Sequence, residues 1–129
     1  DRVKYGAYII SEVKTRLDMI LLCSGSEVEL AMKIKDELLK NYIEIRVVSV
    51  VNLNLFLNQE EEYINQILPK RYKRMVLEFS NDSNWYRLIN NKQDFIGVED
   101  FGKSAREVDI LEDNELDLSN IVIKIKNRL

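Results

Sequence analysis

Short apolar runs alternate with amphipathic stretches along this chain. Runs rich in Ile, Leu and Val that are bounded by turn residues are typical of strands, whereas apolar residues three and four positions apart indicate helices. On this basis we predict strands at residues 7–11, 18–23, 44–51, 74–79 and 95–98. Helices are predicted at 27–40, at 60–68 and at the C-terminal end, with short helical turns at 53–57 and 83–90.

Polar residues and one proline predict where the helices begin and end. Ser26 is expected to be the N-cap of the first long helix, with Glu29 completing a capping box. Pro69 is expected to end the second helix, because proline lacks a backbone N–H and clashes with the preceding turn. Ser119 or Asn120 is expected to cap the last helix.

The order of these segments predicts one α/β domain that includes all 129 residues. Strands that alternate with helices favour a three-layer, doubly wound arrangement with a mainly parallel sheet. Continuous apolar runs such as Ile20–Leu22 fit strands that are covered on both faces. Ala7–Ser11 is expected to join the sheet as an antiparallel edge strand.

Composition narrows the possible functions. Hydrophobic residues make up 46% and the formal net charge is −3, with Lys and Arg interleaved among Asp and Glu, which argues against a nucleic-acid-binding protein. The apolar stretch Met19–Cys23 is too short to span a bilayer, so we expect a cytoplasmic protein with no membrane association. The single Cys23 lies in that stretch and is expected to be a buried, reduced thiol.

Two further features limit the chemistry. The chain contains no histidine, which excludes Ser-His-Asp and Cys-His catalysis and, with a single cysteine, argues against a transition-metal site. The chain begins with Asp1 rather than Met, so we expect it to be part of a longer protein.

A candidate ligand site lies where the predicted parallel strands end, because ligands of open α/β sheets bind beyond the carboxyl ends of the strands. Ser24, Ser26 and Glu27 form the turn after one core strand, and Lys103 and Ser104 follow another. Free N–H groups at the start of the helix and the cation of Lys103 could bind a small anion. The alternative is that Ser26 only caps the helix, that Glu27 favours the helix dipole, and that no ligand binds.

Glu78 ends an apolar strand at the same predicted edge of the sheet. A carboxylate at such a position could hold neighbouring loops, accept backbone N–H bonds or face a partner. We favour a structural role, and the residues themselves identify no catalytic group and no metal ligand.

Several short motifs occur in a fixed order along the chain: Gly6-Ala7-Tyr8, Ser24-Gly25-Ser26-Glu27-Val28, Arg46-Val47-Val48-Ser49, Ile67-Leu68-Pro69 and Phe101-Gly102-Lys103-Ser104-Ala105. Together they resemble the C-terminal domain of transketolase along essentially the whole chain. The chain departs from the family pattern at Arg106, where a proline is usual, and at Val50-Val51, where Met-Pro is usual.

The resemblance implies a parent enzyme of the pentose phosphate pathway that transfers a two-carbon ketol unit between sugar phosphates. Such an enzyme uses thiamine diphosphate and a divalent metal, Mg, and works as a homodimer. The Gly-Asp-Gly…Asn motif that holds this cofactor belongs to an earlier domain and is absent here. The resemblance therefore implies a domain that serves stability and dimer contacts, binds no cofactor itself and carries no catalytic residue.

Three alternatives stay open from the sequence. The chain could be the C-terminal domain of a related 2-oxoacid dehydrogenase beta subunit or deoxyxylulose-phosphate synthase. It could be a regulatory module that binds a small anion or metabolite around Ser26 and Lys103. A free-standing flavodoxin-like enzyme is the weakest alternative, because no phosphate-binding loop supports it.

Overall fold

The computed structural model describes residues 2–97 and 115–129. Its strands are β1 (Ala7–Ser11), β2 (Met19–Ser24), β3 (Ile45–Val50), β4 (Lys73–Leu77) and β5 (Phe95–Ile96). Its α-helices are α1 (Val28–Leu39), α2 (Leu53–Leu57), α3 (Glu61–Ile67) and α5 (Glu115–Arg128). Short 3₁₀ segments lie at η1 (Arg2–Tyr5), η2 (Gly25–Glu27), η3 (Ser83–Leu88) and η4 (Lys92–Asp94).

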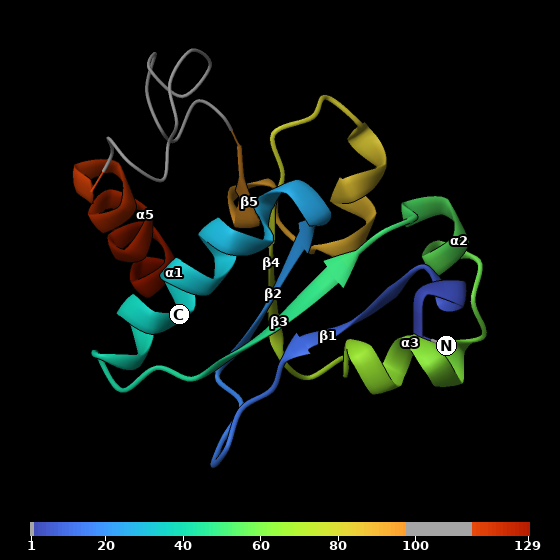
Figure 1. The fold of residues 1–129 in the computed structure, drawn as a ribbon, viewed down its shortest axis with the longest axis horizontal. Helices are drawn as coiled ribbons and strands as arrows, with labels where there is room; N and C mark the ends of the chain where they lie inside the picture. Colours follow the sequence, from blue (N-terminus) through green and yellow to red (C-terminus); the bar gives the residue numbers. More distant parts are fainter. Residues whose placement is uncertain (1, 98–114) are drawn as a thin grey trace.

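The strands form one sheet in the order β1-β3-β2-β4-β5 (Figure 1). Strands β3, β2, β4 and β5 pair in parallel, and β1 pairs antiparallel with β3 at one edge. The register of β1 shifts between Ile9 and Ser11, where the strand contains a bulge. The predicted fold class, with its antiparallel edge strand, is therefore confirmed.

The central strand β2 decides how the layers are built. Its residues Met19 to Cys23 are all fully buried, although their side chains alternate between the two faces of the sheet. Met19, Leu21 and Cys23 pack with α1 and α5 on one face. Ile20 and Leu22 pack with α2, α3 and η3 on the other, which gives three layers (Figure 1).

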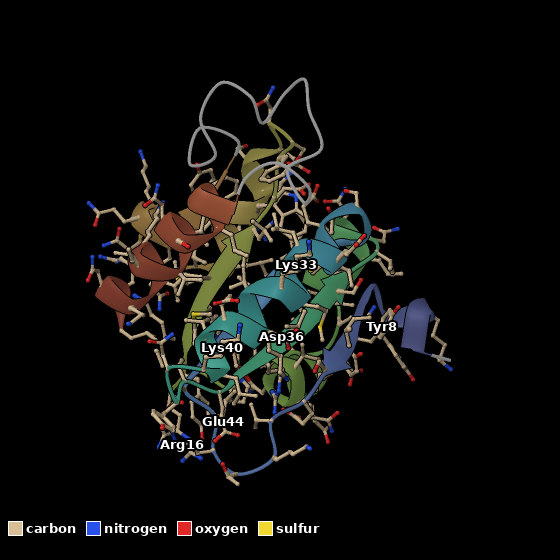
Figure 2. All side chains as sticks on the ribbon, turned by 60° about the vertical axis from the view of Figure 1, so that its left-hand side comes forward. Tyr8, Arg16, Lys33, Asp36, Lys40 and Glu44 are labelled. Atoms are coloured by element: carbon tan, nitrogen blue, oxygen red, sulfur yellow. The ribbon has the colours of Figure 1, made fainter. Side chains whose placement is uncertain are left out.

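Helix α1 shows why this sequence forms a surface helix. Ala31, Ile34 and Leu38 are buried against the sheet at the spacing of one helix face. Lys33, Asp36 and Lys40 follow one another along the helix in Figure 2, on a more solvent-accessible side. Among the described residues, none of the helices combines the length and the hydrophobicity that crossing a membrane requires.

Two predicted helix starts were wrong. Ser26 lies within η2 and forms no capping box, because its hydroxyl donates to the nearly buried carboxyl of Glu27 instead. The last helix begins at Glu115, so Ser119 and Asn120 lie inside it, where they are exposed polar residues rather than caps. The end of α3 at Ile67, just before Pro69, agrees with the prediction.

A buried carboxylate holds the last helix against the sheet. Asp94 is only 2% exposed, and its Oδ1 lies 2.9 Å from both Lys73 Nζ on β4 and Arg128 Nε on α5. Arg128 also donates from Nη1 to the side chain of Gln93 at 3.0 Å. Two cations around one buried carboxylate satisfy a charge that would be costly to bury alone.

Gly6 permits a close crossing of the chain before β1. Its φ is +89°, and a Cβ built at this position would lie 2.5 Å from Phe56 N and 2.6 Å from Asn52 O. Its carbonyl accepts hydrogen bonds from Val51 N and Asn52 N, at 2.8 and 3.0 Å. No larger residue fits between these backbone groups without moving them.

Helix α1 ends in a Schellman motif that places Tyr42 in the left-handed region. Ile43 N donates to Leu38 O at 3.0 Å and Tyr42 N to Leu39 O at 2.9 Å, the two bonds that define the motif. The φ of Tyr42 is +63°, a conformation that favours glycine over residues with a Cβ. The side chain is 83% exposed and therefore gains little packing in return.

We predict that Tyr42→Gly stabilises the domain by about 1 kcal/mol, because it relieves the cost of a left-handed tyrosine. Urea unfolding of the two proteins measures the difference. Tyr42→Ala is the matched control, since it removes the ring but keeps the Cβ. An equal gain in both variants would mean that the exposed ring, and not the backbone, is the source of the strain.

Candidate functional site

Polar side chains gather at the carboxyl ends of β2 and β4. Ser24 is the last residue of β2, and Glu78 directly follows β4. The two strands pair in parallel, with Cys23 opposite Leu77, so the residues that follow lie side by side. Glu27 reaches the same place from η2, the 3₁₀ turn that leads into α1.

Hydrogen bonds join four of these side chains, which we call the Ser24 cluster: Ser24, Ser26, Glu27 and Glu78. Ser24 Oγ lies 2.8 Å from Glu78 Oε1 and also contacts Glu27 Oε2. Ser26 Oγ lies 2.9 Å from Glu27 Oε2 and 3.2 Å from Ser24 Oγ. Phe79 N donates to Glu78 Oε1 at 3.2 Å, which fixes this carboxyl against the end of β4.

Burial makes the charge of this cluster costly. Glu27 is 8% exposed and Glu78 is 7% exposed. Burial raises the pKa of Glu27, and the neighbouring Glu78 carboxyl raises it further, while the hydroxyls of Ser24 and Ser26 lower it. The pKa of the adjacent Cys23 thiol is raised to about 12, first by burial and then by the two carboxyls.

The geometry favours a proton on the Glu27 carboxyl group. Ser24 has a single hydroxyl hydrogen, so it can donate to Glu27 or to Glu78 but not to both. When Ser24 donates to Glu78, its contact with Glu27 is a hydrogen bond only if Glu27 is protonated and donates to the serine oxygen. The Ser24 cluster is therefore suited to hold a proton and to join the turn after β2 to the end of β4.

The structure brings three of the predicted anion-site residues together, Ser24, Ser26 and Glu27. The other two, Lys103 and Ser104, lie outside the described residues. Both serine hydroxyls contact carboxyl groups. Anion binding at this turn thus stays a prediction.

Nothing within residues 2–97 and 115–129 provides a group of three or more His, Cys, Asp or Glu side chains that could hold a metal ion.

The hydrogen bond between Glu78 and Ser24 was not predicted from the sequence. Both residues come at the ends of apolar runs, which the sequence shows. That the two residues meet can be inferred only when β2 and β4 are known to be neighbouring strands.

Comparison with known proteins decides the family. The family model described as "Transketolase-like TK C-terminal domain" matches residues 6–117, most of the chain. This chain belongs to the transketolase C-terminal domain family. The predicted resemblance is confirmed.

Relatives within the transketolase family match over nearly the whole chain. The transketolase of Bacillus subtilis is 34% identical over 126 residues, which are 96% of this chain and 19% of that protein. The transketolase of Aquifex aeolicus is 36% identical over 104 residues, 80% of this chain and 15% of that protein. This chain thus spans a fifth or less of the length of these relatives.

A solved structure shows the same fold. The crystal structure of transketolase from Campylobacter jejuni superimposes with a TM-score of 0.76 at 30% sequence identity, covering 97% of this chain and 19% of that one. The three-layer domain described above is therefore the transketolase C-terminal fold.

The raised pKa of Glu27 predicts that the contribution of this residue to stability falls as pH rises. The folded domain binds a proton at Glu27 more tightly than the unfolded chain does, so this contribution to the free energy of unfolding falls from about the ordinary pKa of 4.5 up through the raised value. Glu27→Gln cannot ionise and should lack this decline. Urea unfolding from about pH 4 to about pH 8 measures both profiles.

Glu29→Gln is the control, because Glu29 is an exposed carboxyl two residues further along, in the first turn of α1. It should keep the decline of the unmodified domain. If the profile of Glu27→Gln instead matched that of the unmodified domain, the proton would not be held at this cluster.

Proposed function

We propose that this chain is the C-terminal domain of a transketolase that transfers a two-carbon ketol unit between sugar phosphates. The parent enzyme would use thiamine diphosphate and a divalent metal such as Mg, act in the cytoplasm in the pentose phosphate pathway, and form a homodimer. This domain would hold that assembly together and supply no catalytic residue. The proposal rests on the family match. This chain aligns with a fifth or less of the length of each of these transketolases, so the rest of such an enzyme would lie in other domains.

The groups at the carboxyl edge of the sheet do not fit a diphosphate cofactor. The Ser24 cluster contains two nearly buried carboxyl groups, and its serine hydroxyls are hydrogen-bonded to them. Carboxylates would repel a diphosphate rather than bind it. The arrangement therefore favours the assembly role over the anion-binding alternative.

A groove beside the edge strand is the surface that we assign to assembly. It has a volume of about 490 Å³ and is lined by Tyr8, Ile9, Ile10, Glu12, Tyr63 and Ile67. Tyr8 lies on β1 at the margin of the sheet in Figure 2. A groove with apolar walls along an edge strand offers both hydrophobic contact and backbone groups to a partner.

The other domains of the parent enzyme are the partner that we assign to this groove. In a protein where this domain is C-terminal, the rest of the polypeptide joins before η1, and η1 packs against β1. The ring of Tyr5 in η1 lies 4.6 Å from that of Tyr63, so the chain enters beside the groove. Tyr63 Oη donates to Ala7 O at 2.6 Å, which fixes this wall against the strand.

We predict that Ile10→Lys in the parent enzyme loosens the contact between this domain and the other domains, and thereby weakens the dimer and lowers ketol transfer. Ile10 is 37% exposed here, and burying only this remaining part of the side chain at an interface contributes about 1 kcal/mol. Analytical ultracentrifugation measures the dissociation, and a ketol-transfer assay measures the activity.

Ile123→Lys is the matched control, because Ile123 is 53% exposed on α5 and lies outside the groove. The same Ile10→Lys change in the isolated domain should leave its melting temperature nearly unchanged. Equal dimer dissociation by both variants would contradict the groove as the assembly surface.

A second prediction concerns the cofactor. Thiamine diphosphate with Mg²⁺ should not change the melting temperature of the isolated chain, whereas it should raise that of the parent enzyme, since a ligand stabilises only a folded protein that binds it. Thermal unfolding with and without cofactor is the measurement. A clear shift for the isolated chain would refute the assignment of cofactor binding to the other domains.

A further inference from the structure

A second cavity, away from the Ser24 cluster, contains an amine in an unusual setting. It has a volume of about 190 Å³ and lies between the segment that follows β1 and the C-terminal half of α1. Val13, Leu39 and Ile43 provide apolar walls, and Lys35 lies among the side chains that line it. This volume is below the roughly 300–1,000 Å³ of sites for drug-sized ligands, so the cavity suits a small group such as a short aliphatic chain.

Neutral acceptors hold the amine of Lys35 in place. Its Nζ donates to Ser11 Oγ at 2.7 Å and to the backbone oxygen of Glu12 at 3.1 Å. A neutral amine has two hydrogens, which these two acceptors can take, and its lone pair then occupies the remaining direction. The unprotonated amine can therefore make both hydrogen bonds and keep its nucleophilic electron pair unused.

Two of the carboxylates that act on Lys35, those of Glu12 and Glu44, are engaged by other groups. Glu12 Oε1 lies 3.0 Å from Arg46 Nε, and Glu44 accepts a hydrogen bond from the hydroxyl of Thr15. Burial lowers the pKa of Lys35, although Glu12, Asp36 and Glu44 act in the opposite direction. At a given pH, the unprotonated and reactive fraction of Lys35 is therefore larger than that of an ordinary lysine.

We propose that Lys35 is a preferred site of acylation, which takes a short acyl group from an acyl phosphate into the cavity beside α1. The lone pair of Nζ attacks the carbonyl carbon and forms a C–N bond. The bond from that carbon to the phosphate oxygen breaks, phosphate leaves with the electron pair, and Nζ gives up one proton to water. Lys14 also lines this cavity, beside the carboxyl groups of Glu12 and Glu44.

Acylation would also change the structure around this lysine. An amide nitrogen keeps one hydrogen, so it can donate to Ser11 or to Glu12 but not to both. One of the two bonds that join α1 to the segment after β1 would be lost together with the charge. The proposal is independent of the ketol-transfer role, since it rests on this cavity alone.

Lys40 is a control on the same helix. Its Nζ lies 2.9 Å from Glu37 Oε1, and this hydrogen bond and the charge of Glu37 raise the pKa of the Lys40 amine. Lys40 is exposed, so access alone would make it the faster of the two lysines to react. Faster reaction at Lys35 than at Lys40 in Glu37→Gln protein, where Lys40 lacks this partner, would have to come from the setting of Lys35.

The test treats the full 129-residue chain with acetyl phosphate at mildly alkaline pH and measures acetylation at each lysine by mass spectrometry of short time points. Lys35 should react severalfold faster than Lys40 in the folded protein, and the two rates should become similar in urea. An equal or slower rate at Lys35 in the folded protein would overturn the proposal, as would a preference that persists in urea.

Two variants separate the cavity from the amine. Val13→Trp fills the cavity from the segment after β1 and should slow acetylation of Lys35 severalfold without changing Lys40. Glu37→Gln removes the partner of Lys40 and should speed that lysine alone. An unchanged Lys35 rate in folded Val13→Trp protein would show that the cavity takes no part.

Discussion

Burial of β2 on both faces is the constraint on which the rest of this domain depends. Every residue from Met19 to Cys23 is inaccessible to solvent, so neighbouring strands must flank β2 and helices must cover both of its faces. Parallel neighbours require long crossover connections, which supply those helices. The same parallel pairing brings the ends of β2 and β4 together and so creates the Ser24 cluster.

Much of this fold could be predicted, because its elements are marked by local signals. Ala7–Ser11 was placed with the right bounds and the right antiparallel pairing, and α2 at Leu53–Leu57 was also right. The first long helix was right to within one residue at each end. Apolar runs, helical spacing and Pro69 are each readable over a few residues, which is the range that such patterns cover.

The features that were missed depend on contacts between distant segments. Asp94 is a buried ion-pair centre only because Lys73 and Arg128 come to it from β4 and α5. Ser26 failed as a cap because Glu27, held near Glu78, offers its hydroxyl a better acceptor. Of the predicted site, three residues lie together, and Lys103 and Ser104 are not described, so the sequence located the edge of the sheet but not its chemistry.

The charged groups described here act mainly as structural ties between segments that are far apart in the sequence. Arg46 donates to the carbonyls of Gln66 and Ile67 at the end of α3, and Arg74 donates to Leu68 O. Asp94 and Glu78 likewise join segments that are far apart in sequence. Lys35 likewise joins α1 to the segment after β1, through Ser11 and Glu12. Its two acceptors are neutral, and its side chain lines a cavity. On our proposal, the hydrogen bonds that hold this segment therefore also leave the amine able to react.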